Sequence, residues 1–128
     1  MATKGPVLVV EDDRNVLDIT SFVLETAGYD VFKAMSAREA LVELGLHRDI
    51  LLVLTDVNMP GDMDGIELVR ELRRQGNPVR CVVVSGDAYH AADRLGDLAP
   101  FLPKPYDRQS LLRAIEDAMP PHHHVHRH

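Results

Sequence analysis

The stretch Ile50-Leu51-Leu52-Val53-Leu54-Thr55-Asp56-Val57-Asn58 decides the fold of this 128-residue chain. Its first half is an almost unbroken apolar run, which is typical of a strand that is buried on both faces of a sheet. Such a strand lies in the middle of a parallel sheet with helices packed on either side. We therefore expect βα units to precede and to follow residues 50–55.

Four other apolar runs, each bounded by turn residues, alternate with stretches of helical period. They predict strands at residues 6–10, 29–33, 79–85 and 101–104. Pro103 places the last strand at an edge of the sheet, because proline has no N–H to donate to a neighbouring strand. Five βα repeats predict a single α/β domain with a doubly wound, three-layer architecture.

The expected helices are identified by their caps and apolar stripes. In the first helix, Val16, Ile19, Val23 and Ala27 are expected to share the buried face before Gly28 ends the helix. The second helix opens with a capping box of Ser36 and Glu39, the third spans residues 65–75, and the fourth spans 87–95 with Asp87 as its cap. Asp107 is expected to cap the last helix, whose apolar stripe consists of Leu111, Leu112, Ile115 and Met119.

Composition narrows the class of protein. The chain has a net charge of −6, which disfavours direct nucleic-acid binding, and no apolar run long enough to insert into a membrane. Its single cysteine, Cys81, cannot form an internal disulfide and is interpreted as a small buried hydrophobe. We expect one cytoplasmic domain at residues 1–119, followed by a His-rich, disordered tail at 120–128.

Polar side chains that suit a cation and a phosphoryl group follow four of the expected strands. In an open α/β sheet, ligands bind beyond the carboxyl ends of the strands. The residues found there are Glu11, Asp12 and Asp13 after the first strand, Asp56 and Asn58 after the third, Ser85 after the fourth and Lys104 after the fifth. Converging carboxylates repel one another, so the arrangement either raises the pKa of one acid or requires a cation, and Mg²⁺ fits oxygen ligands best.

These segments resemble the receiver domain of two-component response regulators, from about Val7 to Met119. The resemblance is carried by Val7-Leu8-Val9-Val10-Glu11-Asp12-Asp13, by Leu54-Thr55-Asp56-Val57-Asn58-Met59-Pro60 with Asp64-Gly65, by Val84-Ser85-Gly86, and by Phe101-Leu102-Pro103-Lys104-Pro105. It implies a flavodoxin-like (βα)5 fold with parallel strand order 2-1-3-4-5, an order for which the chemotaxis regulator is a standard example.

The resemblance also implies roles for individual residues. Asp56 takes the place of the phosphoacceptor, and Glu11, Asp12, Asp56 and the backbone carbonyl of Asn58 take the places that hold Mg²⁺, with Mn²⁺ as a substitute. Lys104 matches the lysine that pairs with the phosphoryl group, and its bond to Pro105 is usually cis in relatives. Ser85 and Phe101 match the switch hydroxyl and the switch aromatic residue, although edge-strand core is an equal reading for Phe101.

By the same resemblance, the protein is a signalling phosphoacceptor and not an enzyme that turns over an external substrate. It would receive its phosphoryl group from a histidine kinase or a phosphotransfer protein and then change its affinity for a downstream protein target. A dimer through the face of the fourth helix, fifth strand and fifth helix is also expected. A free-standing regulator and the receiver part of a hybrid kinase or larger regulator would share the same site.

Two other functions share parts of this pattern. A Mg²⁺-dependent phosphohydrolase with an aspartyl-phosphate intermediate usually has a second acid two residues after the nucleophile, where this chain has Asn58. A flavodoxin-like cofactor binder would need Gly, Ser or Thr after the first strand, where this chain has acids.

Several features depart from the commonest receiver pattern. The loop 59–65 is one residue longer, with Asp62 as the candidate insertion, and the interval from Ser85 to Lys104 is shorter than in the chemotaxis regulator. The tail could bind Ni²⁺ or Zn²⁺ through imidazoles, but a disordered terminus or an expression remnant is the plainer reading. His47 and His90 are isolated and are interpreted as surface residues.

Overall fold

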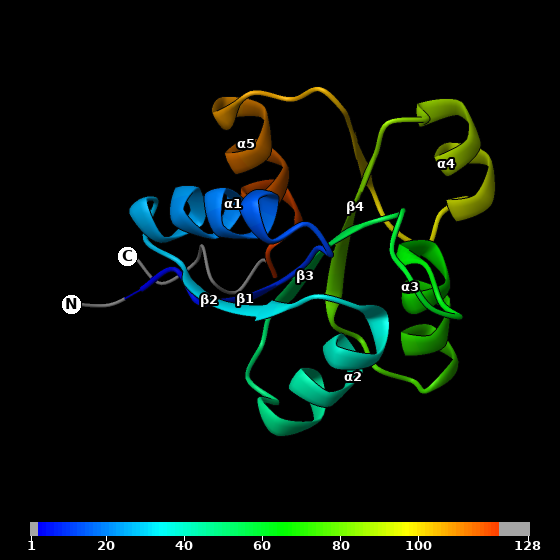
Figure 1. Ribbon diagram of the computed structural model, residues 1–128. Helices are drawn as coiled ribbons and strands as arrows, with labels where there is room; N and C mark the ends of the chain where they lie inside the picture. Colours follow the sequence, from blue (N-terminus) through cyan, green and yellow to red (C-terminus); the bar gives the residue numbers. More distant parts are fainter. Residues whose placement is uncertain (1–2, 121–128) are drawn as a thin grey trace.

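A five-stranded sheet lies between two layers of helices in the computed structural model of the chain, which describes residues 3–120 (Figure 1). The strands are β1 (Pro6–Val10), β2 (Asp30–Ala34), β3 (Leu52–Asp56), β4 (Arg80–Ser85) and β5 (Phe101–Pro103). The helices are α1 (Arg14–Thr26), α2 (Ala37–Leu46), α3 (Gly65–Arg74), α4 (Ala88–Leu95) and α5 (Arg108–Ala118). Neighbouring strands are all parallel, in the order β2-β1-β3-β4-β5, which confirms the expected doubly wound fold.

The sheet buries a separate apolar core on each face. One core packs α2, α3 and α4 against the sheet, and the other packs α1 and α5 against the opposite face. All five residues of β3 are buried, as expected of a central strand that contributes side chains to both cores. Cys81 is 3% exposed and belongs to the first core, which confirms its interpretation as a buried hydrophobe.

Each helix begins at a polar cap whose side chain accepts backbone N–H groups. Asp87 and Asp107 cap α4 and α5, as predicted. At α2, Ser36 Oγ accepts from the Glu39 N–H at 3.1 Å, but the Glu39 carboxylate accepts from the Met35 N–H and not from Ser36, so only half of the predicted capping box forms. The reciprocal capping box occurs instead at α3, between Asp64 and Glu67.

The prediction for the buried face of α1 was correct for Val23 and Ala27, which pack partly buried against the core, and wrong for Val16 and Ile19. The helix buries Leu17, Thr20, Ser21 and Leu24 against the sheet. Val16 and Ile19, which were expected in the core, are 37% and 65% exposed, and Phe22 is 65% exposed. The sequence of α1 carries apolar residues on two faces, and packing against the sheet selects the face that includes the small side chains Thr20 and Ser21. The other apolar stripe of α1, which consists of Val16, Ile19 and Phe22, consequently remains on the surface.

The last βα unit agrees with the sequence-based prediction. Among the described strands, β5 pairs only with β4 and therefore lies at an edge of the sheet. In α5, Leu111 and Ile115 are buried and Leu112 is partly buried, with Met119 following in the same core. The peptide bond between Lys104 and Pro105 is cis. Within residues 3–120, no helix has the length and apolar character needed to cross a membrane; most of the predicted His-rich tail, residues 121–128, lies outside the described residues.

Candidate phosphoacceptor site

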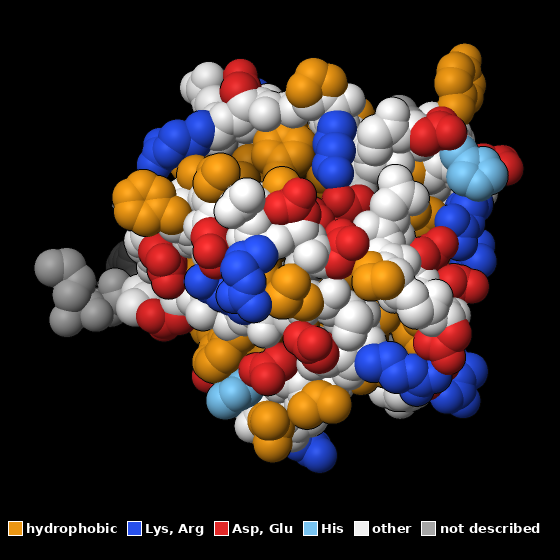
Figure 2. All heavy atoms as spheres, viewed as in Figure 1, with side chains coloured by type: hydrophobic (Ala, Val, Ile, Leu, Met, Phe, Trp, Pro, Cys, Tyr) orange, Lys and Arg blue, Asp and Glu red, His pale blue; other side chains and the backbone are white. Residues whose placement is uncertain are grey.

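Four adjacent strands deliver the predicted site residues to one edge of the sheet. The register pairs Asp56 of β3 with Val84 of β4, and Ser85 with Pro103 of β5. β1 and β3 are in register up to Val10 and Thr55, so Glu11 and Asp56 follow side by side. The face in Figure 2 shows acidic side chains gathered near its centre, with a basic side chain directly above them.

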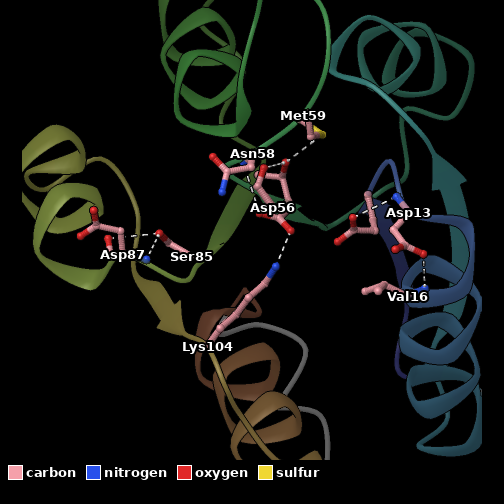
Figure 3. Close-up of polar contacts among 10 residues, drawn as sticks. Asp13, Val16, Asp56, Asn58, Met59, Ser85, Asp87 and Lys104 are labelled. Atoms are coloured by element: carbon pink, nitrogen blue, oxygen red, sulfur yellow. Dashed lines mark hydrogen bonds and ion pairs between the residues drawn. The ribbon is translucent and has the colours of Figure 1, made fainter.

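Asp56 and Lys104 form the central ion pair of this site. Lys104 Nζ lies 2.6 Å from Asp56 Oδ2, and the Asp56 side chain is only 6% exposed (Figure 3). Burial on its own would lower the pKa of Lys104, but the hydrogen bond and the negative charge of Asp56 outweigh it and raise that pKa. The Lys104 backbone N–H also donates to the Ser85 carbonyl at 2.8 Å, and this hydrogen bond holds the backbone of Lys104 against the end of β4.

The peptide that carries Asp56 is held tightly by its neighbours. The Asn58 N–H donates to Asp56 Oδ1 at 3.0 Å, and the buried Thr55 hydroxyl donates to the Asp56 carbonyl at 3.0 Å. The first residue of α3, Gly65, approaches the same carbonyl so closely that a Cβ atom there would lie 2.1 Å from the Asp56 oxygen. The two ends of the loop of residues 57–64 therefore lie against each other, and the Asp56 side chain points out of the sheet edge toward Lys104.

Glu11 is a buried acid that faces Asp56. It is 8% exposed, and its Oε2 accepts from the Asp13 N–H at 3.0 Å. Burial, followed by the side chain and charge of Asp56 and by the side chain of Asp12, raises the pKa of Glu11 to about 7, against the lowering effect of the Asp13 N–H. Two acids that repel each other in this way favour either a shared proton or a cation between them.

The two acids that follow Glu11 differ in orientation. Asp13 turns away from the site and caps α1, with its Oδ1 accepting from the Asn15 and Val16 N–H groups (Figure 3). Asp12 is exposed beside the site. The sequence-based assignment of Asp13 to a place outside the acidic pair is thus consistent with its capping role.

The donor set fits a magnesium ion that keeps most of its water. Within residues 3–120, no three His, Cys, Asp or Glu side chains lie close enough to hold a metal by themselves. Mg²⁺ does not need such a cage, because it binds through one or two carboxylates, several waters and phosphate oxygens. Burial, and after it the neighbouring Asp56, raises the pKa of Glu11, and a divalent cation would offset this cost of ionising Glu11.

Ser85 and Phe101 are the two residues predicted to act as a switch. The Ser85 hydroxyl donates to the Asp87 carbonyl at 3.1 Å and accepts from the Asp87 N–H at 3.0 Å, so it is turned toward the start of α4 (Figure 3). Phe101 is half-buried and packs against the core that contains α2, α3 and α4. Ser85 lies at the sheet edge next to Asp56, whereas Phe101 lies at the start of β5, opposite Val83.

The sequence-based reading missed two ion pairs that tether the loop after Asp56. Arg38 of α2 binds Asp62, and Arg94 of α4 binds Asp64. The reciprocal cap of α3 could have been found, because Asp64 and Glu67 have capping-box spacing. No sequence motif identifies the two arginine partners, because Arg38 lies 24 residues from Asp62 and Arg94 lies 30 residues from Asp64.

Comparisons with known proteins agree with this geometry. The family model described as "Response regulator receiver domain" matches residues 7–116. The chain is 35% identical over 118 residues to the transcriptional regulatory protein FixJ of Azorhizobium caulinodans, covering 89% of this chain and 54% of FixJ. It is 37% identical over 128 residues to the sensor kinase CckA of Brucella abortus, covering 93% of this chain and 13% of CckA.

A solved structure gives the same result for the fold. The chemotaxis protein CheY4 of Vibrio cholerae superimposes with a TM-score of 0.78 at 27% identity, over 90% of this chain and 98% of that protein. The chain thus spans about half the length of FixJ, a small part of CckA and nearly all of CheY4. Its fold, its acidic sheet edge and the match over residues 7–116 show that the chain belongs to the response regulator receiver domain family of two-component signalling.

Proposed function

We propose that this chain is a cytoplasmic phosphoacceptor in which Asp56 receives a phosphoryl group from a phosphohistidine of a histidine kinase or phosphotransfer protein. The observation that carries the proposal is the contact of 2.6 Å between Lys104 Nζ and the carboxylate of the buried Asp56, opposite the buried acid Glu11. A structural ion pair would not need a second acid beside it. An acceptor for phosphoryl transfer does need both a nucleophilic carboxylate and cations around it.

The residues present can each perform a part of the transfer. Asp56 forms a new bond from its carboxylate oxygen to phosphorus, and the bond from phosphorus to the donor imidazole nitrogen breaks as the imidazole leaves. Lys104 remains within reach of the phosphoryl oxygens and offsets their charge. The Asn58 N–H, which already donates to Asp56 Oδ1, keeps the carboxylate oriented. Subsequent attack of water on phosphorus would regenerate the free Asp56.

The same site suits Mg²⁺, held by Glu11, Asp12, Asp56 and the backbone carbonyl of Asn58, with Mn²⁺ as a substitute. When bound, the ion would neutralise charge on the transferred group and bring a further coordination site for one of its oxygens. Glu11 would enter this arrangement as a carboxylate and Asp12 would supply the exposed ligand. Receiver domains of this family generally bind Mg²⁺, and the acidic pair of this chain fits that property.

Phosphorylation would then move Ser85. The phosphoryl group adds roughly −1.5 to −2 charge and strong acceptor oxygens, which offer the Ser85 hydroxyl a better partner than the Asp87 backbone. Movement of Ser85 leaves space beside β5 that the half-buried ring of Phe101 can fill. A change in the surface around α4, β5 and α5 follows, and we propose this surface as the site for a target protein or a second copy.

The exposed stripe of α1 is the proposed docking surface for the phosphodonor. Val16 and Ile19 of this stripe line a groove together with the half-buried Val23 and Tyr106 and the buried Leu111. α1 begins directly after the acidic pair, and Tyr106 follows Lys104 by two residues, so this groove borders the site. A protein that presents a phosphohistidine to Asp56 would cover the stripe and bury side chains such as Ile19, which is 65% exposed.

The proposal is tested by incubation with acetyl phosphate and Mg²⁺ followed by intact mass measurement. The parent protein should gain one phosphoryl group, and Asp56→Asn should gain none. Asp62→Asn is the matched control, because Asp62 is an exposed acid of the same loop that does not face Glu11. Modification of Asp56→Asn to the parental extent would refute Asp56 as the acceptor, and sustained hydrolysis of an external phosphomonoester would favour the phosphohydrolase instead.

A further inference from the structure

Arg94 ties α4 to the loop that leaves the phosphoacceptor strand. Its Nη1 lies 2.8 Å from Oδ2 of Asp64, and each of the two side chains is 25% exposed. Asp64 ends the loop of residues 57–64 that begins directly after Asp56, and it also caps α3. In addition, the guanidinium of Arg70 on α3 donates to the Arg94 carbonyl. Arg94 therefore holds α4 to α3 through both its side chain and its backbone.

α4 also packs beside β5, but few of its own side chains are buried. It is eight residues long, which corresponds to about 12 Å of helix. Among its residues whose side chains are described, only Ala91 and Leu95 are buried, whereas Tyr89 is 93% exposed. Figure 1 shows the helix at the edge of the molecule beside α3, away from α1 and α5. A helix anchored by one alanine and one leucine depends strongly on its polar contacts.

Both ends of α4 are thus connected to the site around Asp56. At its start, the cap Asp87 is bonded through its backbone to the Ser85 hydroxyl. Near its end, Arg94 is bonded to Asp64. If Ser85 turns from Asp87 toward Asp56, as proposed above, both of its hydrogen bonds to Asp87 break and the first turn of α4 is released from β4. A shift of this short helix as a rigid body would also stretch the contact between Arg94 and Asp64.

We propose that the Asp64–Arg94 ion pair is a latch that opposes the switch of Ser85 and α4, and so sets how readily the chain adopts its phosphorylated arrangement. The inference rests on the proposed function of Asp56. Partial burial gives this pair its effect, because attraction between charges increases as water is excluded. The pair between Arg38 and Asp62 belongs to the same loop, but its side chains are 69% and 66% exposed, and such pairs contribute little.

The two pairs provide a matched test. Mg²⁺ with beryllium fluoride, which mimics the phosphoryl group without a covalent bond, is titrated while the α4 amides are followed by NMR. Arg94→Gln should lower the half-saturating concentration by about three- to tenfold, because the latch no longer opposes the switched arrangement. Arg94→Lys, which keeps the charge, and Arg38→Gln, which breaks the exposed pair, should each stay within about twofold of the parent.

Asp64→Asn gives an independent arm, because an asparagine oxygen can still accept from the Glu67 N–H and preserve the cap of α3. It should reproduce the effect of Arg94→Gln, and the double variant should show no more than either single change. If Arg94→Gln does not fold, Asp64→Asn decides the question alone.

The outcomes that overturn the latch are specific. Parental or weaker beryllium fluoride binding by folded Arg94→Gln and Asp64→Asn overturns it, as do additive effects in the double variant. A parent protein that does not respond to Mg²⁺ and beryllium fluoride at all overturns the proposed function, and the latch with it. A responsive parent with unresponsive variants overturns the latch alone.

Discussion

At the scale of single residues, the site contains more negative than positive charge when Glu11 is ionised. Lys104 compensates Asp56, but Glu11 lies buried against the same carboxylate and has its pKa raised to about 7. Below that pH the folded protein therefore holds a proton that an unfolded glutamate would have released near its ordinary value of 4.5. Ionisation of Glu11 consequently costs free energy in the folded state that it does not cost in the unfolded state.

This imbalance predicts how stability depends on pH. In metal-free protein, the free energy of unfolding should fall by about 1–3 kcal/mol as the pH rises from about 5 to about 8, because the folded state binds more protons than the unfolded state in that window. Chemical denaturation in the presence of EDTA measures the change. Glu11→Gln should show a much shallower slope, and identical slopes for parent and variant would contradict the assignment to Glu11. Mg²⁺ should restore stability at the higher pH.

Gly65 is the residue that allows α3 to begin against the backbone of Asp56. A Cβ atom at this position would lie 2.1 Å from the Asp56 carbonyl oxygen. Gly65→Ala should therefore lower the free energy of unfolding by about 3 kcal/mol, because the loop must shift to relieve the overlap. Gly45 of α2 has open space around it, and Gly45→Ala should instead raise stability by about 0.5–1 kcal/mol. Urea denaturation of both variants measures the contrast, and similar effects of the two changes would argue against the close approach.

At the scale of elements, the helices differ in how firmly they are held. α3 buries Ile66, Leu68, Val69 and Leu72, whereas α4 relies on Ala91 and Leu95 and on the contacts of Arg94. This difference is suited to a switch, since an element that must move cannot be anchored by a large apolar surface.

The expected consequence is a difference in local opening. Backbone amides of α4 should exchange with solvent at least about tenfold faster than those in the middle of α3. Hydrogen exchange followed by NMR measures this in the parent protein, with β3 as the internal reference for global unfolding. Equal protection of α3 and α4 would show that the two helices open together and that α4 is not an independently mobile element.

At the scale of the whole molecule, the two cores meet at the same sheet. Leu8 and Leu52 are both fully buried, but Leu8 packs toward α2, α3 and α4, whereas Leu52 packs toward α1 and α5. The same strands contribute side chains to both cores, so the sheet that supports one core is destabilised when the other is lost. The fold should therefore behave as a single cooperative unit.

Truncation of either core tests this cooperativity. Leu8→Ala and Leu52→Ala should each lower the free energy of unfolding by about 2–5 kcal/mol. Amide signals from both helical layers should disappear at one denaturant midpoint in each variant. Separate midpoints for the two layers would mean that the sheet does not couple them.

The sequence by itself determined the framework and the composition of the candidate site. The apolar run from Ile50 to Thr55, the edge position of Pro103 and the cap at Asp107 are local signals. The edge strand and the cap were predicted correctly, and the run coincides with β3 to within two residues. Residues at the carboxyl ends of neighbouring parallel strands must meet at one edge, so the order of the strands was enough to bring Glu11, Asp56 and Lys104 together.

Only the tertiary structure decided which face of α1 is buried, where the Ser85 hydroxyl points and which arginines tether the loop after Asp56. α1 has two apolar stripes, and its period alone does not distinguish the one that fits the sheet. The pairing of Asp64 with Arg94 joins residues 30 positions apart on separate elements. Local patterns specify the direction and period of a segment, but distances between side chains of distant segments are fixed only when the whole chain packs.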